Sequence, residues 1–386
     1  MKIGIDKIAY YTPEYYLDLV DLAHARGVDP NKYLIGLMQK EMSVAPLDQD
    51  TVTMAANAAD QILSKTDKDE IGLLILATES GIDQSKAAAL YVQELLHISS
   101  QARVYEIKEA CYGATAALTS ALDYITNHPS KKALIIASDI VRYGLNTPGE
   151  VTQGAGAVAM LISTDPKIVS LDGQSEIHSE QIMDFWRPNY AKEALADGHY
   201  SQEQYLKFFQ IVFKAYMQKH HLDLSYFSAM LFHLPYAKLA FKALNLALET
   251  DKSGSSKRLS QAFPQAIHLN QKVGNIYTAS LYLSLISLLQ FDQQLKTGDK
   301  IAAFSYGSGA VAEFFTLTIE ADFEGRLSKI DNDRLIGNRK KLSIAEYERA
   351  FQASLPEDGS DFQVTAMSKA PFKLLGIHGH KRVYGQ

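Results

Sequence analysis

The sequence predicts a layered α/β protein built from two related halves. Three observations lead to this fold class: apolar runs of strand length alternate with segments of helical period, those runs are apolar on both faces, and a pattern of glycine turn and strand occurs twice. Continuous apolar runs are typical of strands that helices cover on both sides. A strand–helix–strand order therefore favours a sheet with helical layers around it.

The first series of elements lies in the N-terminal third of the chain, and a second series follows it. In the first series, strands are expected at 71–77, 103–108 and 133–137, and helices at 51–63, 87–96 and 113–125. In the second series, strands are expected at 229–232, 301–305 and 310–319, and helices at 236–248 and 276–289. The alternation is that of βαβ units.

The two series look like copies of one another. Residues 154–163 and 307–316 match at five of ten positions, at an offset of 153 residues. The strand that ends at Glu79 and the strand that ends at His233 differ by 154 residues. Repeated self-similarity at a fixed offset indicates an internal duplication. We therefore expect an N-terminal half at 1–165 and a C-terminal half at 166–386.

Two regions break this symmetry. Residues 172–225 are polar and aromatic, and we interpret them as an insertion that shapes a pocket, with a helix at 202–219. Residues 320–370 are charged, and we interpret them as an excursion with a helix at 343–353. A last strand is expected at 372–377.

Composition excludes several classes of protein. Of 386 residues, 47% are hydrophobic and 21% are charged, which argues against long disorder. Lys and Arg number 38 and Asp and Glu 44, so the net charge of −6 gives no general attraction to nucleic acid or anionic membrane. The single cysteine excludes an internal disulfide and a multi-cysteine zinc site. No signal peptide or membrane-spanning run of about 18 apolar residues is present, so a cytoplasmic location is expected.

Metal and nucleotide sites are poorly supported. No His-Glu-x-x-His pattern and no phosphate-binding loop occur. The glycine pairs at 154 and 156 and at 307 and 309 precede strands rather than helices, so they are not dinucleotide fingerprints.

Cys111 stands where a nucleophile is expected, between a predicted strand and a predicted helix. The positive end of the helix dipole would favour the thiolate and lower the pKa of the thiol. Small neighbours, such as Ala110 and Gly113, would let a substrate approach. The alternative is a small buried hydrophobic residue, which describes most free cysteines.

Three further residues fit a site built around that thiol. His233 follows a strand, where sites of α/β proteins are usually built, although a histidine satisfied at a strand exit is the plainer interpretation. Asn275 has the alternative role of a helix cap. Glu79 closes an apolar strand, so desolvation would raise its pKa towards the range of a general base; a solvated loop carboxylate is the alternative.

Taken together, five segments resemble the hydroxymethylglutaryl-CoA synthases of the shorter bacterial type. They are Glu109-Ala110-Cys111-Tyr112-Gly113, Phe232-His233-x-Pro235, Gly274-Asn275-x-Tyr277-Thr278-Ala279-Ser280, Tyr306-Gly307-Ser308-Gly309 and Asp184-Phe185-Trp186-Arg187-Pro188. The similarity extends over nearly the whole chain. It implies the thiolase-like duplicated five-layer αβαβα sandwich, a homodimer and a place in the mevalonate pathway.

The resemblance also implies a chemistry. Cys111 would take an acetyl group from acetyl-CoA, and Glu79 would remove a proton from its methyl group. The carbanion would attack acetoacetyl-CoA, with His233 at the developing alkoxide. Asn275 would support His233, and main-chain N–H groups of Cys111 and the Gly307-Ser308 turn would stabilise the oxyanion. Both substrates are CoA thioesters, and neither a metal nor an organic cofactor is implied.

Other positions are carried over as substrate-binding candidates. Lys238 and Lys242, spaced i and i+4 on one helix, would meet CoA phosphates, with a solvated lysine face as the alternative. Tyr143 and Ser308 resemble residues that line the acyl pocket, and Asp184 resembles one that supports the site from the insertion.

Two rival functions share the Cys-His-Asn set. A ketoacyl-acyl-carrier-protein synthase III forms its carbanion by decarboxylation and requires no carboxylate base, so Glu79 distinguishes it. A thiolase-fold scaffold or acyl-CoA binder requires no reactive thiol at all.

Overall fold

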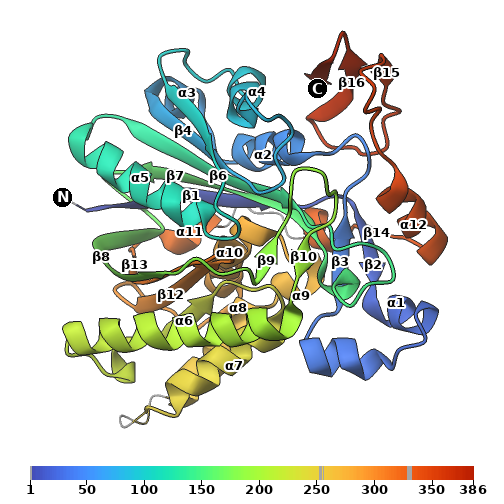
Figure 1. Cartoon of the computed structure of the whole chain (residues 1–386). Coiled ribbons are helices and arrows are strands. Elements are labelled where there is room, and N and C mark those ends of the chain that lie inside the picture. Colours follow the sequence, from blue (N-terminus) through green and yellow to red (C-terminus); the bar gives the residue numbers. More distant parts are fainter. Residues whose placement is uncertain (1, 252–253, 255, 328–332) are drawn as a thin grey trace.

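The structure is a computed structural model that describes residues 2–251, 254, 256–327 and 333–386. Within these residues, nine strands form one large sheet (Figure 1). In spatial order they are β11 (Ala229–Phe232), β12 (Lys300–Gly307), β13 (Val311–Ile319), β8 (Val169–Ser179), β1 (Ile3–Tyr11), β7 (Ala155–Ser163), β6 (Lys132–Ile140), β4 (Ile71–Ala77) and β5 (Arg103–Ile107).

The strand order repeats from one half to the other. β4 runs parallel to β6, which is antiparallel to β7, which is antiparallel to β1. β11, β12, β13 and β8 have the same relations in the same order. The halves join where Gly4 of β1 pairs with Ser170 of β8; a Cβ on Gly4 would lie 2.1 Å from the Val169 oxygen. Since β4 and β11 hold equivalent places, Glu79 and His233 follow equivalent strand ends.

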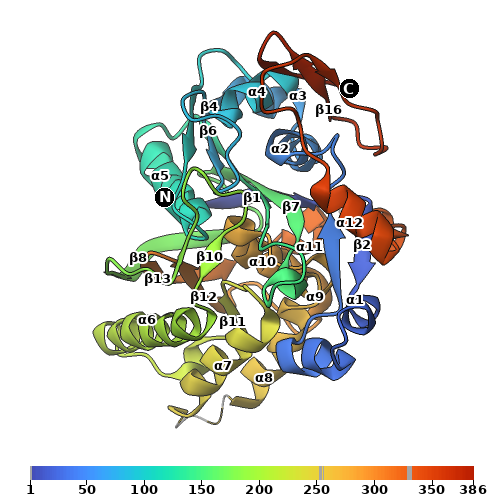
Figure 2. The same ribbon diagram turned by 45° about the vertical axis from the view of Figure 1, so that its right-hand side comes forward.

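Helices cover both faces of both halves, which gives five layers from top to bottom in Figures 1 and 2. α2 (Thr51–Asp60) and α4 (Ala88–Leu95) form the outer layer on the N-terminal half. α5 (Gly113–Asn127) and α10 (Ser280–Phe291) lie between the halves, with α8 (Ser256–Ala266) beside α10. α6 (Gly198–Lys219) and α7 (Ala237–Leu248) form the other outer layer. The predicted thiolase-like sandwich is confirmed.

Side-chain alternation along the strands creates two cores. On β12 and β13, Ala303 and Phe315 face the middle helices and join the core shared by both halves. Phe304 and Phe314 point to the opposite face and pack with the aromatic side of α6. Successive residues of a strand point to opposite faces, so one strand supplies both cores.

Two expected segments differ from the structure. Residues 172–179 are the second half of β8, and 175–179 pair with β13 beyond a register shift, so the segment outside the large sheet begins only at 180. This part of β8 is largely solvent-exposed, which explains why its polar composition suggested an insertion. The helix expected at 276–289 begins at Ser280, after the short helical turn η4 (Tyr277–Ala279). Asn275 Oδ1 accepts hydrogen bonds from the Tyr277 N–H and the Ser280 hydroxyl, and these hold the turn tight.

Smaller elements surround the sheet. β2 (Tyr15–Asp18), β3 (Glu41–Val44) and β14 (Lys340–Lys341) form one small sheet, and β15 (Phe362–Gln363), β16 (Lys373–His378) and β17 (Lys381–Gly385) form another. The rest are β9 (Phe185–Trp186), β10 (Leu195–Ala196), α1 (Leu19–Ala25), α3 (Lys65–Glu70), α9 (Asn270–Val273), α11 (Phe323–Leu327), α12 (Ile344–Gln352), η1 (Lys32–Leu37), η2 (Glu150–Thr152), η3 (Leu224–Tyr226) and η5 (Asp333–Gly337).

The C-terminal region combines expected and unexpected features. The helix expected at 343–353 is α12, and the last expected strand is β16, which pairs with β15 and β17 rather than with the large sheet. Arg382 and Tyr384 of β17 both donate to Asp50, the residue that caps α2, at 2.7 and 2.8 Å. Residues 328–332 of the expected excursion lie outside the described residues.

In the described part of the chain, the helices are too short or too polar to cross a membrane.

Candidate active site

The ends of two parallel strands bring Glu79 and Cys111 together. β4 ends at Ala77 and β5 at Ile107, and because they are parallel neighbours their carboxyl ends meet at one edge of the sheet. The Sγ of Cys111 donates a hydrogen bond to Oε1 of Glu79 at 3.4 Å. Ala110 has a φ of +34°, so the chain turns sharply just before the thiol. Tyr112 then caps α5, which confirms the predicted strand-to-helix junction.

Burial raises the pKa of the Glu79 carboxyl well above its usual value, and the nearby Asp139 adds to this shift. That direction agrees with the sequence expectation for a general base. The expectation for the thiol is wrong: burial and the Glu79 carboxylate raise the pKa of Cys111 well above its usual value. Asp139 and Asp184 act in the same direction. These carboxylates outweigh the helix terminus, so the resting thiol is protonated and shares a hydrogen bond with Glu79.

Asp139, on β6, is a site residue that the sequence reasoning missed. Its buried Oδ1 accepts hydrogen bonds from the main-chain N–H groups of Glu79 and Ser80 and from the hydroxyls of Thr78 and Ser80, at 2.8–3.0 Å. Oδ2 accepts from the Thr278 N–H at 3.3 Å. Burial raises the pKa of Asp139 to about 7, although these hydrogen bonds lower it. An aspartate inside an apolar strand was the available signal, because buried carboxylates are rare without a specific role.

His233 follows β11 and is 2% exposed. Its N–H donates to the Phe304 oxygen at 2.8 Å, and its carbonyl accepts from the Tyr205 hydroxyl at 2.7 Å. Burial lowers the pKa of His233 to about 3, so the ring is neutral. Its Nδ1 is buried and has no hydrogen-bond partner among the described residues. No hydrogen bond joins this ring to Cys111 or Glu79 within the same residues.

Asn275 is held beside the N-terminal half by two close backbone approaches. A Cβ on Gly154 would lie 2.5 Å from the Asn275 oxygen, and a Cβ on Gly274, where φ is +87°, would lie 2.1 Å from the Gln153 oxygen. Glycine at both positions is therefore required for this contact. The Asn275 side chain also lies near the Tyr143 hydroxyl, whose pKa it lowers.

The Gly307-Ser308 turn packs against the nucleophile loop. A Cβ on Gly307 would lie 2.7 Å from the Tyr112 Cβ and 2.8 Å from its nitrogen. Asp184, which is fully buried, accepts hydrogen bonds from the Gly309 N–H and the Tyr306 hydroxyl, both at 2.9 Å. Asp184 thus links the segment after β8 to this turn.

Aromatic rings enclose the space beside the thiol. The rings of Tyr143, Phe185 and Tyr277 meet edge to face, with centroids 5.8–6.1 Å apart. Burial raises the pKa of Tyr143, and the neighbouring Cys111 and Glu79 add to that effect. Tyr143 is therefore buried close to Cys111 and Glu79.

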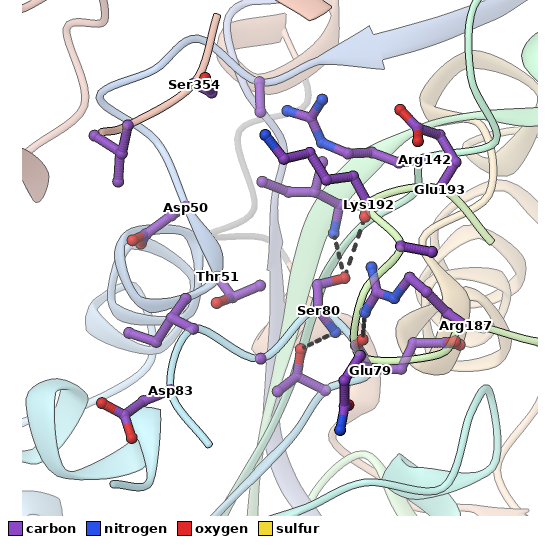
Figure 3. A pocket seen from close by; sticks show the side chains of 18 of the residues that line it. Asp50, Thr51, Glu79, Ser80, Asp83, Arg142, Arg187, Lys192, Glu193 and Ser354 are labelled. Atoms are coloured by element: carbon purple, nitrogen blue, oxygen red, sulfur yellow. Dashed lines mark hydrogen bonds between the residues drawn. The ribbon is translucent and has the colours of Figure 1, made fainter. Parts of the chain in front are cut away.

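A cavity of about 1330 Å³ opens on the Glu79 side of the site (Figure 3). Glu79, Ala110, Ser308 and Arg187 line it, and in Figure 3 the guanidinium of Arg187 points at the main chain of Glu79. The other predicted site residues, namely Cys111, His233, Asn275, Gly307, Tyr143, Asp184, Lys238 and Lys242, are not among its described lining residues.

The two predicted lysines lie on α7, which begins four residues after His233. Lys238 is half-buried, with Nζ 5.1 Å from the centre of the Phe241 ring. Lys242 is exposed and donates to Gln202 Oε1 at 3.2 Å. Neither lysine lines the cavity at Glu79.

The predicted site residues are thus divided between two copies of one structural unit: the thiol and the carboxylate lie on the first copy, and the histidine and the asparagine lie on the second. This division defines the thiolase-like condensing enzymes. Family models narrow the class. The N-terminal model of hydroxymethylglutaryl-coenzyme A synthase matches residues 1–167, and the C-terminal model matches 169–264 and 255–358. The chain belongs to the hydroxymethylglutaryl-CoA synthase family.

Individual relatives agree with this assignment. The chain is 44% identical over 384 residues to the hydroxymethylglutaryl-CoA synthase of Enterococcus faecalis, covering 100% of both chains. It is 32% identical to the polyketide biosynthesis 3-hydroxy-3-methylglutaryl-ACP synthase PksG of Bacillus subtilis, covering 92% of this chain and 89% of the relative. A crystal structure of a hydroxymethylglutaryl-CoA synthase complexed with CoA superposes with a TM-score of 0.97, at 45% identity and full coverage of both chains.

Proposed function

We propose that this chain condenses acetyl-CoA with acetoacetyl-CoA and water, giving 3-hydroxy-3-methylglutaryl-CoA and CoA. The observation that carries the proposal is the 3.4 Å hydrogen bond between the Cys111 thiol and the Glu79 carboxylate. A nucleophile and a base at this separation suit a reaction on one acyl group, which supports the proposal. The family, the Enterococcus relative and a solved structure of MvaS in complex with 3-hydroxy-3-methylglutaryl coenzyme A support the same reaction.

The first half-reaction is an acetyl transfer. Cys111 attacks the thioester carbonyl of acetyl-CoA, and its proton passes along the existing hydrogen bond to Glu79. The C–S bond to CoA breaks, the CoA thiolate takes up the proton, and acetyl-Cys111 remains. Because Glu79 accepts the proton as the thiol reacts, a protonated resting thiol is compatible with nucleophilic attack.

The second half-reaction forms the carbon–carbon bond. Glu79, ionised again, removes a proton from the acetyl methyl group, a task that suits a carboxylate whose pKa is raised by burial. The carbanion attacks the ketone of acetoacetyl-CoA, and the alkoxide that forms gains one proton, which balances the proton that Glu79 removes. His233 is neutral, so it serves the developing alkoxide as a hydrogen-bond donor rather than as an imidazolium acid. Asn275, which is held in a fixed turn, is the proposed support for His233.

Hydrolysis completes the cycle. Water attacks the thioester to Cys111, the thiol is restored, and a free carboxylate is left on 3-hydroxy-3-methylglutaryl-CoA. The main-chain N–H groups of Cys111 and of the Gly307-Ser308 turn are the proposed donors to the tetrahedral oxyanion. Asp184 holds that turn through the Gly309 N–H. The scheme consumes only CoA thioesters and water.

Substrate contacts are also part of the proposal. Tyr143 borders the acyl group, and Ser308 is the turn residue that reaches the cavity at Glu79. Lys238 and Lys242 are the proposed partners of the CoA phosphates, as compact cations on an accessible helix.

Assembly and location are part of the proposal. β5 is an edge strand of the large sheet, and no strand of the described residues pairs with its outer side. Unpaired edges invite pairing with another chain, so a second copy of this protein, joined along β5, is the proposed partner. The proposed setting is the cytoplasmic mevalonate pathway.

The test is direct. Purified protein is incubated with acetyl-CoA alone, quenched in acid and weighed, and its peptides are then mapped. An acetyl group on the Cys111 peptide, absent from Cys111→Ala, establishes the acyl-enzyme. Acetoacetyl-CoA is then added and 3-hydroxy-3-methylglutaryl-CoA is measured. An unmodified thiol in a folded protein would contradict the covalent route. Condensation of malonyl substrates alone would favour a decarboxylating synthase instead.

A further inference from the structure

One short segment, Asp184–Arg187, touches three separate parts of the proposed site. Asp184 holds the turn after β12 through the Gly309 N–H. The ring of Phe185 lies 6.0 Å from that of Tyr143 and 5.8 Å from that of Tyr277. Arg187 Nη2 donates a hydrogen bond to the main-chain oxygen of Glu79. The last contact involves the proposed base itself.

The peptide groups of Glu79 are held from both sides. Its N–H donates to the buried Oδ1 of Asp139 at 2.9 Å, and its carbonyl accepts from the Arg187 guanidinium (Figure 3). Asp139 belongs to β6, whereas Arg187 follows β9 in the segment that interrupts the repeat. The loop that carries the base is therefore fixed between an element of the sheet and an element outside it.

We propose that Arg187 is a positioning residue for the condensation, which fixes the main chain of Glu79 and keeps a positive charge beside its carboxylate. This inference rests on the proposed function, in which Glu79 is the base. A guanidinium suits both tasks, because it has five N–H donors and stays charged.

The charge surroundings of Glu79 explain why a cation there matters. The groups that face its carboxylate are the Cys111 thiol and Glu109 from the loop after β5, Asp139 from β6, and the hydroxyls of Tyr143 and Tyr277. Asp139 and Glu109 disfavour a second anion beside them, whereas the hydrogen bond from the Cys111 thiol and the positive charge of Arg187 favour the ionised Glu79 carboxylate. An opposite charge nearby favours the ionised carboxylate. Without Arg187, the base would hold its proton at higher pH.

Three variants separate charge from contact. Arg187→Gln removes the positive charge. Arg187→Lys keeps the charge but removes the guanidinium that donates to the main-chain oxygen of Glu79. Lys192→Gln is the matched control, because it removes one positive charge from the same cavity while its partner is the exposed Glu357. Thermal unfolding confirms that each variant is folded.

The readout is the pH dependence of kcat/KM for the condensation. Arg187→Gln is expected to move the acid limb upward by about one pH unit, the size of a close charge effect. Arg187→Lys is expected to leave the acid limb at the same pH and to lower kcat/KM. Lys192→Gln is expected to match the unaltered protein in both respects. An unmoved limb in folded Arg187→Gln, or an equal shift in Lys192→Gln, overturns the proposal.

A second readout does not depend on turnover. Cys111 is the single cysteine of the chain, so its alkylation by iodoacetamide is followed by mass at each pH. The thiol is hydrogen-bonded to Glu79, so loss of the nearby cation is expected to shift the alkylation midpoint upward in Arg187→Gln but not in Lys192→Gln. If the unaltered protein makes no product, the proposed function fails, and this measurement alone decides whether Arg187 controls the Glu79–Cys111 pair.

Discussion

The thiol of Cys111 and the carboxylate of Glu79 form one proton-sharing pair, 3.4 Å apart, supplied by the ends of two neighbouring parallel strands. Burial raises the pKa of each group, and the Glu79 carboxylate raises the pKa of the thiol further, whereas the hydrogen bond from Cys111 lowers the pKa of Glu79. The pair therefore keeps a proton at neutral pH and releases it only when the sulfur of Cys111 attacks a thioester carbonyl. A reactive cysteine of this kind differs from one activated as a free thiolate.

Slow alkylation at neutral pH is the first consequence. Because the pKa of Cys111 is raised, iodoacetamide is expected to label it slowly at pH 7 even in an active enzyme. Removing a neighbouring negative charge lowers a thiol pKa, so Glu79→Gln is expected to shift the alkylation midpoint to lower pH by about one unit or more. Intact mass, measured over time at several pH values, follows the reaction. A midpoint that stays in place would contradict the pairing.

Glu79→Ala is expected to separate the two half-reactions. Loss of a positioned base typically costs a factor of about 10² to 10⁴, so the overall rate should fall within that range. The acetyl-enzyme should still form, more slowly, and then persist, because the methyl proton has no acceptor. Rapid-quench mass analysis of the Cys111 peptide measures this. Undiminished condensation in Glu79→Ala would favour the decarboxylating alternative, which requires no carboxylate base.

The strands and the residues at their ends were predictable from the sequence. Continuous apolar runs mark β4, β6 and β11, and parallel pairing then brings the ends of β4 and β5 together. The internal repeat also identified the equivalence of Glu79 and His233. Apolar runs and internal repeats are local or periodic patterns, and such patterns can be recognised in a single sequence.

Features that depend on several distant segments were missed or misjudged. The carboxylates that raise the thiol pKa lie at residues 79, 139 and 184, and their convergence exists only in the folded chain. Asp139 lies two residues beyond the strand expected at 133–137, in the part of β6 that the sequence interpretation left out. The outer half of β8 was interpreted as an insertion, because a strand with exposed polar side chains has the composition of a loop.

Gly307 offers a test of packing against the nucleophile loop. An added Cβ would lie 2.8 Å from the Tyr112 nitrogen, which is backbone and cannot swing aside. Gly307→Ala is therefore expected to displace Cys111 and lower kcat by about 100-fold, the cost of a misplacement of about 1 Å. Gly198→Ala is the control, since a Cβ there meets open space. Equal activity of the two variants, both folded, would show that the turn does not position the thiol.

Asp67 gives a prediction for acid stability, independent of the site. Its buried carboxylate accepts hydrogen bonds from Lys7 Nζ at 2.5 Å and Lys132 Nζ at 2.7 Å. Burial alone would raise the pKa of Asp67, but these contacts and the Ser64 hydrogen bonds outweigh it and lower the pKa well below the usual value. A lowered carboxyl pKa stabilises the folded state above the unfolded-state pKa of about 4, and this contribution disappears as the pH falls below it.

Asp67→Asn is expected to lower the free energy of unfolding at pH 7 by about 1–3 kcal/mol, the usual cost of removing hydrogen bonds between a buried carboxylate and charged partners. The difference from the unaltered protein should shrink between pH 5 and pH 2, because the unaltered protein loses the same contribution on protonation. Urea unfolding at constant ionic strength measures both proteins at each pH. Asp165→Asn is the control, since Asp165 is 81% exposed and its ion pair with Lys167 contributes little. A difference that stayed constant down to pH 2 would show that the Asp67 carboxylate is not ionised in the folded protein.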